Sequence, residues 1–208
     1  EIVNSPAVAD GVVYFGARTG TFHAVDAKSG RKVWLQRCMP LSTNGNQKGF
    51  SYSAPLVFGD RVIVGGDDGF LYCLARADGK ELWKLGLDDL SEVWSSPKTN
   101  GKLVMVGTKS GFLWGIDPIA GVQRWKANVG DAIGGSLAIV GATQGVIPAR
   151  DKRLHAIDLE KGTVLWRCDL PNFSMGAPSL ALGYAFFQAR GGHFLAVEAG
   201  AGRFVAGL

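Results

Sequence analysis

The sequence predicts an all-β fold, a β-propeller of five four-stranded blades, on three observations. Glycine supplies 30 of the 208 residues without a Gly-X-Y period, which is typical of many tight turns between short strands. The apolar runs are strand-sized and are interrupted by Gly or by charged residues, so we expect no transmembrane segment. One pattern recurs five times along the chain at the spacing of a propeller blade.

The recurring pattern is a small residue, an acid two positions later, Gly six positions later and Trp ten positions later. Four copies read AVDAKSGRKVW at 24–34, CLARADGKELW at 73–83, GIDPIAGVQRW at 115–125 and AIDLEKGTVLW at 156–166. A fifth and weaker copy, AVEAGAGRFVA, covers 196–206. The first interval is longer than the others because a polar loop, PLSTNGNQKGFSYS, is inserted before the second repeat.

Each repeat has the same internal order of elements. A short segment such as SPAV at 5–8 is followed by an apolar run, a polar Gly turn, a second apolar run, the acid-to-Gly turn and a last run that ends in Trp. Four short strands and their turns fit the size of one blade, and a blade needs neighbours to cover its two faces. We therefore expect a single propeller domain over 1-208, with blades at about 5-38, 53-87, 95-130, 135-170 and 176-208.

The chemistry of the pattern explains its spacing. The acid lies where a strand enters a turn, so its carboxylate can accept hydrogen bonds from the N–H groups of that turn. The Gly permits a positive φ, and the Trp ring can cover the Gly backbone of a neighbouring sheet while its N–H reaches a carbonyl. The predicted structural docking residues are Asp26, Gly30, Trp34, Gly79, Trp83, Asp117, Gly121, Trp125, Asp158, Gly162 and Trp166.

These repeats resemble the pyrroloquinoline-quinone-like propeller repeat, whose tryptophan-docking motif is matched by the first, third and fourth copies. The second copy departs with Cys73 and Ala75, and the fifth departs with Glu198 and Ala206. Rings of this family usually contain seven or eight blades, so the five repeats either close as an unusually small ring or form part of a larger propeller. We favour the second, in which they pack against further blades of the same propeller. The resemblance also implies an extracytoplasmic location, periplasmic or secreted, which nothing else in the sequence indicates.

The resemblance covers several functional classes: quinoprotein dehydrogenases, an outer-membrane assembly propeller, sensor domains of kinases and propellers attached to acyl-activating enzymes. A dehydrogenase site of this family needs a base, a calcium cage and, in many members, a vicinal Cys pair. Cys38, Cys73 and Cys168 lie far apart, and no acid can be nominated as a base. We expect no catalytic residue, no metal and no cofactor; pyrroloquinoline quinone with calcium belongs only to the dehydrogenase alternative.

The leading hypothesis is a non-catalytic propeller that acts as a binding scaffold or sensor for a protein partner or a small anionic ligand. The alternatives are a segment of a quinone-dependent dehydrogenase, or an accessory propeller of an acyl-activating enzyme or kinase. The net charge of +4 comes without any Lys/Arg-rich run, so we expect no nucleic-acid partner.

One column of residues in the turns between second and third strands is rich in cations. It reads Arg18, Asp67, Lys109, Arg150 and Arg190. Equivalent turns of a propeller lie on one face, so the four cations form a candidate ligand-binding arc for an anion. The alternative is that the turns carry ordinary solvated charges.

Histidines and linker residues supply the remaining candidates. His23 and His155 occupy the strand position of Tyr72 and Trp114, which favours packing over metal binding, whereas His193 lies beside the last turn and can supplement Arg190. The linkers before the first strands carry apolar residues that form either a partner surface or a plug of the propeller mouth. They are Phe50, Tyr52, Trp94, Phe173 and Met175.

Overall fold

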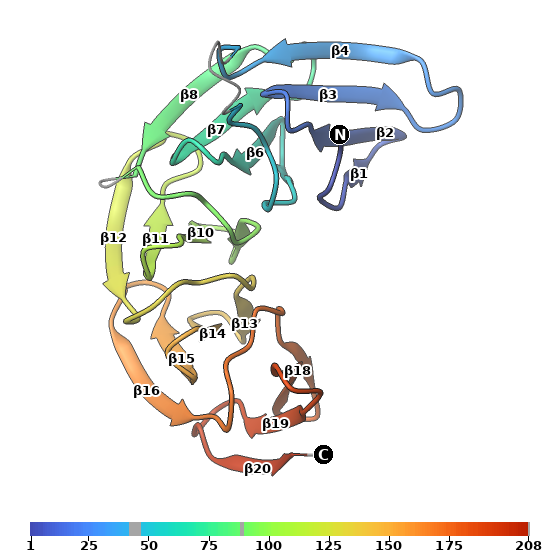
Figure 1. The fold of residues 1–208 in the computed structure, drawn as a ribbon. Helices are drawn as coiled ribbons and strands as arrows, with labels where there is room; N and C mark the ends of the chain where they lie inside the picture. The colour runs from blue at the N-terminus through green and yellow to red at the C-terminus, as the bar shows by residue number, and fades with distance from the viewer. Residues whose placement is uncertain (42–46, 88–89, 208) are drawn as a thin grey trace. The chain divides into compact units, whose positions relative to one another are not determined.

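The computed structural model describes residues 1–41, 47–87 and 90–207. Its regular structure is all-β, as predicted, and consists of five four-stranded antiparallel sheets. In each sheet the strands follow one another in chain order (Figure 1). Within the described ranges, no helix is long and apolar enough to cross a membrane.

The strands of each sheet lie inside the corresponding predicted blade. The first sheet contains β1 (Ala7–Ala9), β2 (Val12–Gly16), β3 (Thr21–Asp26) and β4 (Lys32–Arg37). The second contains β5 (Leu56–Phe58), β6 (Arg61–Gly65), β7 (Phe70–Ala75) and β8 (Glu81–Gly86). The third contains β9 (Lys98–Thr99), β10 (Val104–Gly107), β11 (Phe112–Ile116) and β12 (Gln123–Asn128). The fourth contains β13 (Ala138–Val140), β14 (Gln144–Ala149), β15 (Arg153–Asp158) and β16 (Val164–Asp169). The fifth contains β17 (Ser179–Ala181), β18 (Tyr184–Gln188), β19 (Phe194–Glu198) and β20 (Phe204–Gly207).

The small residue of the repeat pattern is the cross-strand partner of the Trp. Ala24 pairs with Trp34, Gly115 with Trp125 and Ala156 with Trp166. In every sheet the register shifts immediately after this position, between the third and fourth strands. Such a bulge increases local twist, and a small partner leaves room for the Trp ring beside it.

The chain divides into two compact units. Unit 1 consists of residues 1–97 and 118–122, and unit 2 consists of residues 98–117 and 123–208. The core of unit 1 packs Tyr14 and Phe22 of the first sheet against Val62, Val64 and Leu74 of the second. That the five blades form a single domain stays a prediction.

The core of unit 2 consists of two clusters. One joins Met105 and Leu113 to Ile147 of the fourth sheet. The other joins Leu154 to Phe187 and neighbouring residues of the fifth sheet. Each sheet inside the unit therefore buries apolar side chains against the next.

Four Trp rings lie on the Gly turn of the following blade, each within one unit. The indole N–H groups donate to main-chain carbonyls: Trp34 to Arg76 at 2.8 Å, Trp83 to Pro118 at 3.1 Å, Trp125 to Leu159 at 2.9 Å and Trp166 to Gly200 at 3.1 Å. The rings occupy the space that a side chain would need at Gly79, Gly121, Gly162 and Gly202. Gly30 also has a positive φ, of 68°, but no described atom lies within 4 Å of its side-chain position.

The acids of the pattern accept hydrogen bonds close to their own turns. Asp26 Oδ1 accepts from the Ser29 N–H at 2.7 Å, and Asp158 Oδ1 accepts from the Glu160 and Lys161 N–H groups at 2.9 Å. The hydrogen bonds from Ser29 lower the pKa of Asp26, and that from Lys161 lowers the pKa of Asp158. Asp117 accepts from Arg124 Nη2 at 2.7 Å.

Candidate functional site

The cation column occupies equivalent positions in the turns between second and third strands. The N–H of Arg150 donates to the Ala132 carbonyl, and the N–H of Arg190 donates to the Phe173 carbonyl. In unit 1 the N–H groups of Arg18 and Asp67 donate in the same way to Glu1 and Gly49. Each of these turns is thus tied to the segment that leads into its own blade.

In unit 1 the column does not offer a free cation. Arg18 Nη1 lies 3.0 Å from Glu1 Oε2 in an exposed ion pair, which contributes little stability. Asp67 is buried and accepts hydrogen bonds from the N–H and the hydroxyl of Ser51. Burial raises the pKa of Asp67. The fourth cation, Lys109, is exposed and belongs to unit 2.

In unit 2, Arg150 and Arg190 meet at one aromatic ring. Their Cζ atoms lie 5.4 and 5.5 Å from the centroid of the Phe173 ring. Among the residues that the structure describes, neither guanidinium has a carboxylate within ion-pair distance. Two like charges on one ring without a counter-charge produce a local positive potential that favours an anion.

The linker before the fifth blade supplies the apolar part of this site. Phe173, Met175, Gln188 and Arg190 are among the residues that line a hollow of about 360 Å³. Met175 is 41% exposed. The buried Ser174 fixes the linker, because its hydroxyl donates to the Gln188 carbonyl at 2.7 Å. We call Arg150, Phe173, Met175, Gln188 and Arg190 the Arg150–Arg190 site.

The other apolar linker residues divide between the two expected roles. Phe50 is fully buried and packs edge-on against the rings of Phe22 and Tyr72. Tyr52 is 54% exposed and lies 5.3 Å, centroid to centroid, from the half-buried Trp94. Phe50 is therefore a core residue, whereas Tyr52 and Met175 are available at the surface.

The histidines of the strand column lie within sheets. His23 stacks on Phe15 at 5.0 Å, and its Nε2 lies 2.9 Å from the Thr21 hydroxyl. His155 is buried, with Nε2 2.9 Å from Asp151 Oδ2. Burial lowers the pKa of both imidazoles. His193 is exposed beside Gly191, which lines the same hollow.

The described residues contain no group of three or more His, Cys, Asp or Glu side chains that could hold a metal ion. Burial raises the pKa of Cys38 to about 12 and that of Cys73 to about 11, which keeps these thiols unreactive at neutral pH. That the protein needs no metal or cofactor stays a prediction.

A second set of cations is absent from the predicted site residues, although the repeat pattern places them regularly, directly after a docking Trp. Lys84, Lys126 and Arg167 each follow a docking Trp directly. Lys84 Nζ lies 4.0 Å from the Phe70 centroid, and Lys126 Nζ lies 3.8 Å from the Phe112 centroid. Arg167 has no such ring, because the residue equivalent to Phe70 and Phe112 is Arg153.

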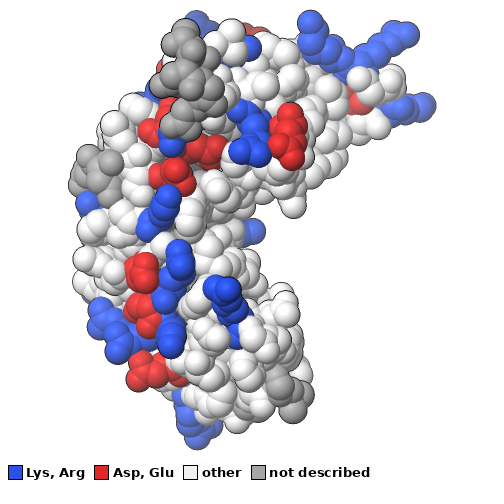
Figure 2. Space-filling model, in the orientation of Figure 1, with Lys and Arg blue, Asp and Glu red and all other residues white. Residues whose placement is uncertain are grey.

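Charges of both signs are mixed over the surface. Figure 2 shows Lys and Arg side chains beside Asp and Glu on the face that it draws, without one continuous basic area. The absence of a nucleic-acid partner stays a prediction.

The sequence model described as outer membrane protein assembly factor BamB matches residues 1–145 and 131–205. The BamB of Xanthomonas campestris pv. campestris is 37% identical over 82 residues, which cover 38% of this chain and 20% of that protein. The quinohemoprotein alcohol dehydrogenase of Comamonas testosteroni is 33% identical over 86 residues, which cover 38% of this chain and 11% of that protein.

Two solved structures share the fold over the whole chain. BamB from Moraxella catarrhalis has a TM-score of 0.82 at 19% identity, and the Comamonas testosteroni dehydrogenase has a TM-score of 0.84 at 16% identity. This chain covers 64% and 43% of those two chains, so it spans less than two thirds of either. With the family match over almost all of its length, the chain belongs to the pyrroloquinoline-quinone-like propeller family described as outer membrane protein assembly factor BamB.

Proposed function

We propose that this chain is a non-catalytic binding scaffold, and that the Arg150–Arg190 site of unit 2 binds an acidic, partly apolar segment of a partner protein. The observation that carries the proposal is the meeting of Arg150 and Arg190 on the Phe173 ring without an ion-paired carboxylate among the described residues. Each guanidinium can take a carboxylate in a bidentate hydrogen bond. Phe173 and the exposed Met175 can pack against an apolar side chain between the acids.

Two considerations favour a protein segment over a small anion. The site combines two cations with an exposed apolar side chain, which a simple anion would leave uncovered. The relatives described as BamB are named assembly factors of outer membrane proteins, which supports a protein-binding role here. The same description supports an extracytoplasmic location for this chain.

The dehydrogenase alternative has weaker support. The Comamonas testosteroni relative matches 38% of this chain and 11% of its own length. The described residues supply no cluster of metal-binding side chains, and a quinone with calcium depends on one. No observation favours an accessory role on an acyl-activating enzyme or a kinase.

A fluorescein-labelled peptide in which Glu and Leu alternate tests the proposal by fluorescence anisotropy. The double variant Arg150→Gln/Arg190→Gln should bind it at least tenfold more weakly than the wild type. The matched control, Arg124→Gln/Arg203→Gln, removes the same charge from ion pairs elsewhere in unit 2 and should bind within twofold of the wild type.

Two further probes separate the alternatives. A peptide with Gln in place of Glu should bind at least tenfold more weakly, and citrate should compete only at much higher concentration than unlabelled peptide. Equal losses in the two double variants would show unspecific charge attraction and overturn the proposal. Citrate competing as well as the peptide would replace the protein segment by a small anion.

A further inference from the structure

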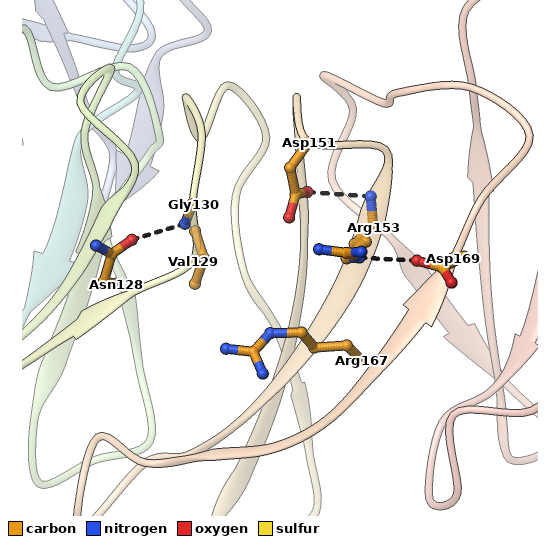
Figure 3. A pocket seen from close by; sticks show the side chains of 7 residues that line it. All are labelled: Asn128, Val129, Gly130, Asp151, Arg153, Arg167 and Asp169. Carbon is orange, nitrogen blue, oxygen red and sulfur yellow. Dashed lines mark hydrogen bonds and ion pairs between the residues drawn. The ribbon is translucent and has the colours of Figure 1, made fainter.

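A polar groove lies in unit 2 between the end of β12 and the outer part of the fourth sheet. Asn128 and Gly130 line one side, and Asp151, Arg153, Arg167 and Asp169 line the other (Figure 3). Its volume is about 670 Å³, which is within the range of small-molecule sites. None of these residues belongs to the Arg150–Arg190 site, so the groove is a separate feature.

In the equivalent groove of unit 1, the cation after the docking Trp is paired with the carboxylate of the turn. It is lined by Met39, Leu41, Asp68, Phe70 and Lys84. Lys84 Nζ lies 3.8 Å from Asp68 Oδ2 and also contacts the faces of the Phe70 and Tyr72 rings. The cation is thus satisfied by an ion pair and by two aromatic rings.

In unit 2 the corresponding ion pair is open. Arg167 occupies the position of Lys84 after the docking Trp, and Asp151 occupies the position of Asp68 in the turn. Asp151 Oδ2 lies 2.9 Å from His155 Nε2, and its Oδ1 accepts from the Arg153 N–H at 3.1 Å. The Arg167 guanidinium makes no hydrogen bond, ion pair or ring contact with any residue that the structure describes.

Both aromatic residues that face Lys84 in unit 1 are replaced in unit 2. His155 stands at the position of Tyr72 and contacts the turn carboxylate of Asp151, as the Tyr72 hydroxyl contacts that of Asp68. Arg153 replaces Phe70, and its Nε is taken by Asp169 Oδ1 at 2.7 Å. Arg167 therefore has neither ring nor carboxylate.

The remaining charges of the groove are one cation and one anion that do not touch. Arg153 and Asp169 neutralise each other, whereas Arg167 and Asp151 are not within ion-pair distance of one another. Asn128 Oδ1 accepts the Gly130 N–H at 2.7 Å, and its amide NH₂ makes no other hydrogen bond with the described residues. In Figure 3 the Arg167 side chain extends towards the Asn128–Gly130 segment, and Asp151 points into the groove from its turn.

We propose that this groove binds a small zwitterion of the amino-acid or short-peptide class. The ligand's carboxylate binds the Arg167 guanidinium and the Asn128 amide, and its ammonium group binds Asp151. A simple anion would meet the negative charge of Asp151, and a simple cation would meet the positive charge of Arg167. A ligand with both charges closes the ion pair that the unit 1 groove closes by itself.

Nuclear magnetic resonance on the ¹⁵N-labelled 208-residue chain tests this proposal with three probes. Glycylglycine carries both charges, N-acetylglycylglycine carries only the carboxylate, and glycylglycine amide carries only the ammonium group. Glycylglycine should shift the Arg167 Nε–H and Asn128 side-chain signals in a saturable way. Each blocked probe should bind at least tenfold more weakly.

Variants localise the site. Arg167→Gln should weaken glycylglycine binding at least tenfold without lowering the unfolding midpoint, because the Arg167 guanidinium has no hydrogen bond or ion pair with the described residues. The control Arg124→Gln lies in the same unit but pairs with Asp117, so it should bind as the wild type does. N-acetylglycylglycine binding as tightly as glycylglycine would reduce the groove to an anion site and overturn the zwitterion. Absence of saturable shifts, or unchanged affinity in Arg167→Gln, would overturn the site itself.

Discussion

The docking Trp residues show how far a residue's role can be predicted from spacing. Their position ten residues after a small residue predicts that each ring covers a Gly of a neighbouring sheet. Spacing does not predict how deeply each ring is buried, because that depends on what else packs around it. Trp34 and Trp125 are 6% and 7% exposed, whereas Trp83 and Trp166 are only half-buried.

Replacement of Trp125 by Ala should lower the free energy of unfolding by about 3 kcal/mol or more. The substitution removes a buried ring and leaves the Leu159 carbonyl without its indole donor. Denaturant melts measure the loss. As a control, Leu165→Ala in β16 removes a side chain that is 50% exposed and should cost much less. A loss for Trp125→Ala below about 0.5 kcal/mol, the range of surface changes, would contradict the docking role.

His155 should make stability depend on pH in a defined direction. Burial lowers its pKa in the folded protein, so as pH falls below about 6.5 the unfolded chain takes up a proton first. The free energy of unfolding therefore declines from that pH downwards, and it does not change above it on account of this residue. Asp151, Arg153 and Arg167 are the charged groups that act on the imidazole.

The variant His155→Phe keeps an aromatic residue at a position where other blades carry Tyr72 and Trp114. Its free energy of unfolding should decline less than that of the wild type between pH 7 and pH 5. Urea melts across this range measure the difference. Parallel curves for the two proteins would show that His155 is not held neutral by the fold.

At the scale of the element, strands could be predicted and linkers could not. The strands follow from short apolar runs and from turns that need Gly, and all twenty described strands fall within the predicted blades. The linkers are irregular, so no periodicity tells which side chain points inwards. Phe50, Val93 and Ile133 pack over Gly16, Gly65 and Gly107 of the second strands and are fully buried. Tyr52, two residues after Phe50, remains exposed.

The candidate site divides in the same way. Aligning the turns predicts Arg150 and Arg190 as equivalent residues on one face. It does not predict that both reach Phe173, because that contact depends on the path of an irregular linker across two blades. Alignment of the turns also does not predict the unpaired charges of Arg167 and Asp151 in the polar groove of unit 2. Those charges accompany the replacement of two aromatic strand residues by Arg153 and His155.

The Gly turn that receives a Trp ring offers a matched test at this scale. Gly162 and Gly141 have similar positive φ values, of 70° and 64°, but only Gly162 lies against a ring, that of Trp125. Gly141→Ala should cost about 1 kcal/mol through the left-handed backbone alone. Gly162→Ala should cost at least about 1 kcal/mol more, because the new methyl group displaces the ring. Equal losses in thermal or denaturant melts would show that the ring does not depend on this Gly.

At the scale of the whole molecule, the fifth sheet differs from the others in what covers it. Phe186 and Phe194 occupy positions that are at most 1% exposed in the other four sheets. Phe186 corresponds to Met105 and Val146, and Phe194 corresponds to Leu113 and Leu154. Phe194 is 51% exposed, and its ring stacks on that of Phe186 at 6.0 Å. This face is apolar where a sheet of the same kind would normally be buried.

The 208-residue chain should therefore self-associate as its concentration rises. Light scattering should show a growing mean mass, and Phe194→Glu should shift the molecules towards the monomer. Leu182→Glu is the control, because Leu182 is 93% exposed in a turn and lies outside this face. A monodisperse monomer at all concentrations would contradict self-association through the face of Phe186 and Phe194.

The docking contacts also bear on how such a chain changes in length during evolution. Each Trp finds its Gly and its carbonyl on the next blade, as Trp34 does at Gly79 and Trp125 does at Gly162. One repeat therefore contains the Gly turn that receives the Trp of the preceding blade and the Trp that docks on the following blade. After duplication or loss of one whole repeat, every docking Trp still meets a Gly turn on the next blade. Insertion or deletion of part of a repeat leaves a Trp without a Gly turn, or a Gly turn without a Trp. Viable lengths should consequently differ in steps of one repeat, the 40 to 42 residues that separate Gly79, Gly121, Gly162 and Gly202.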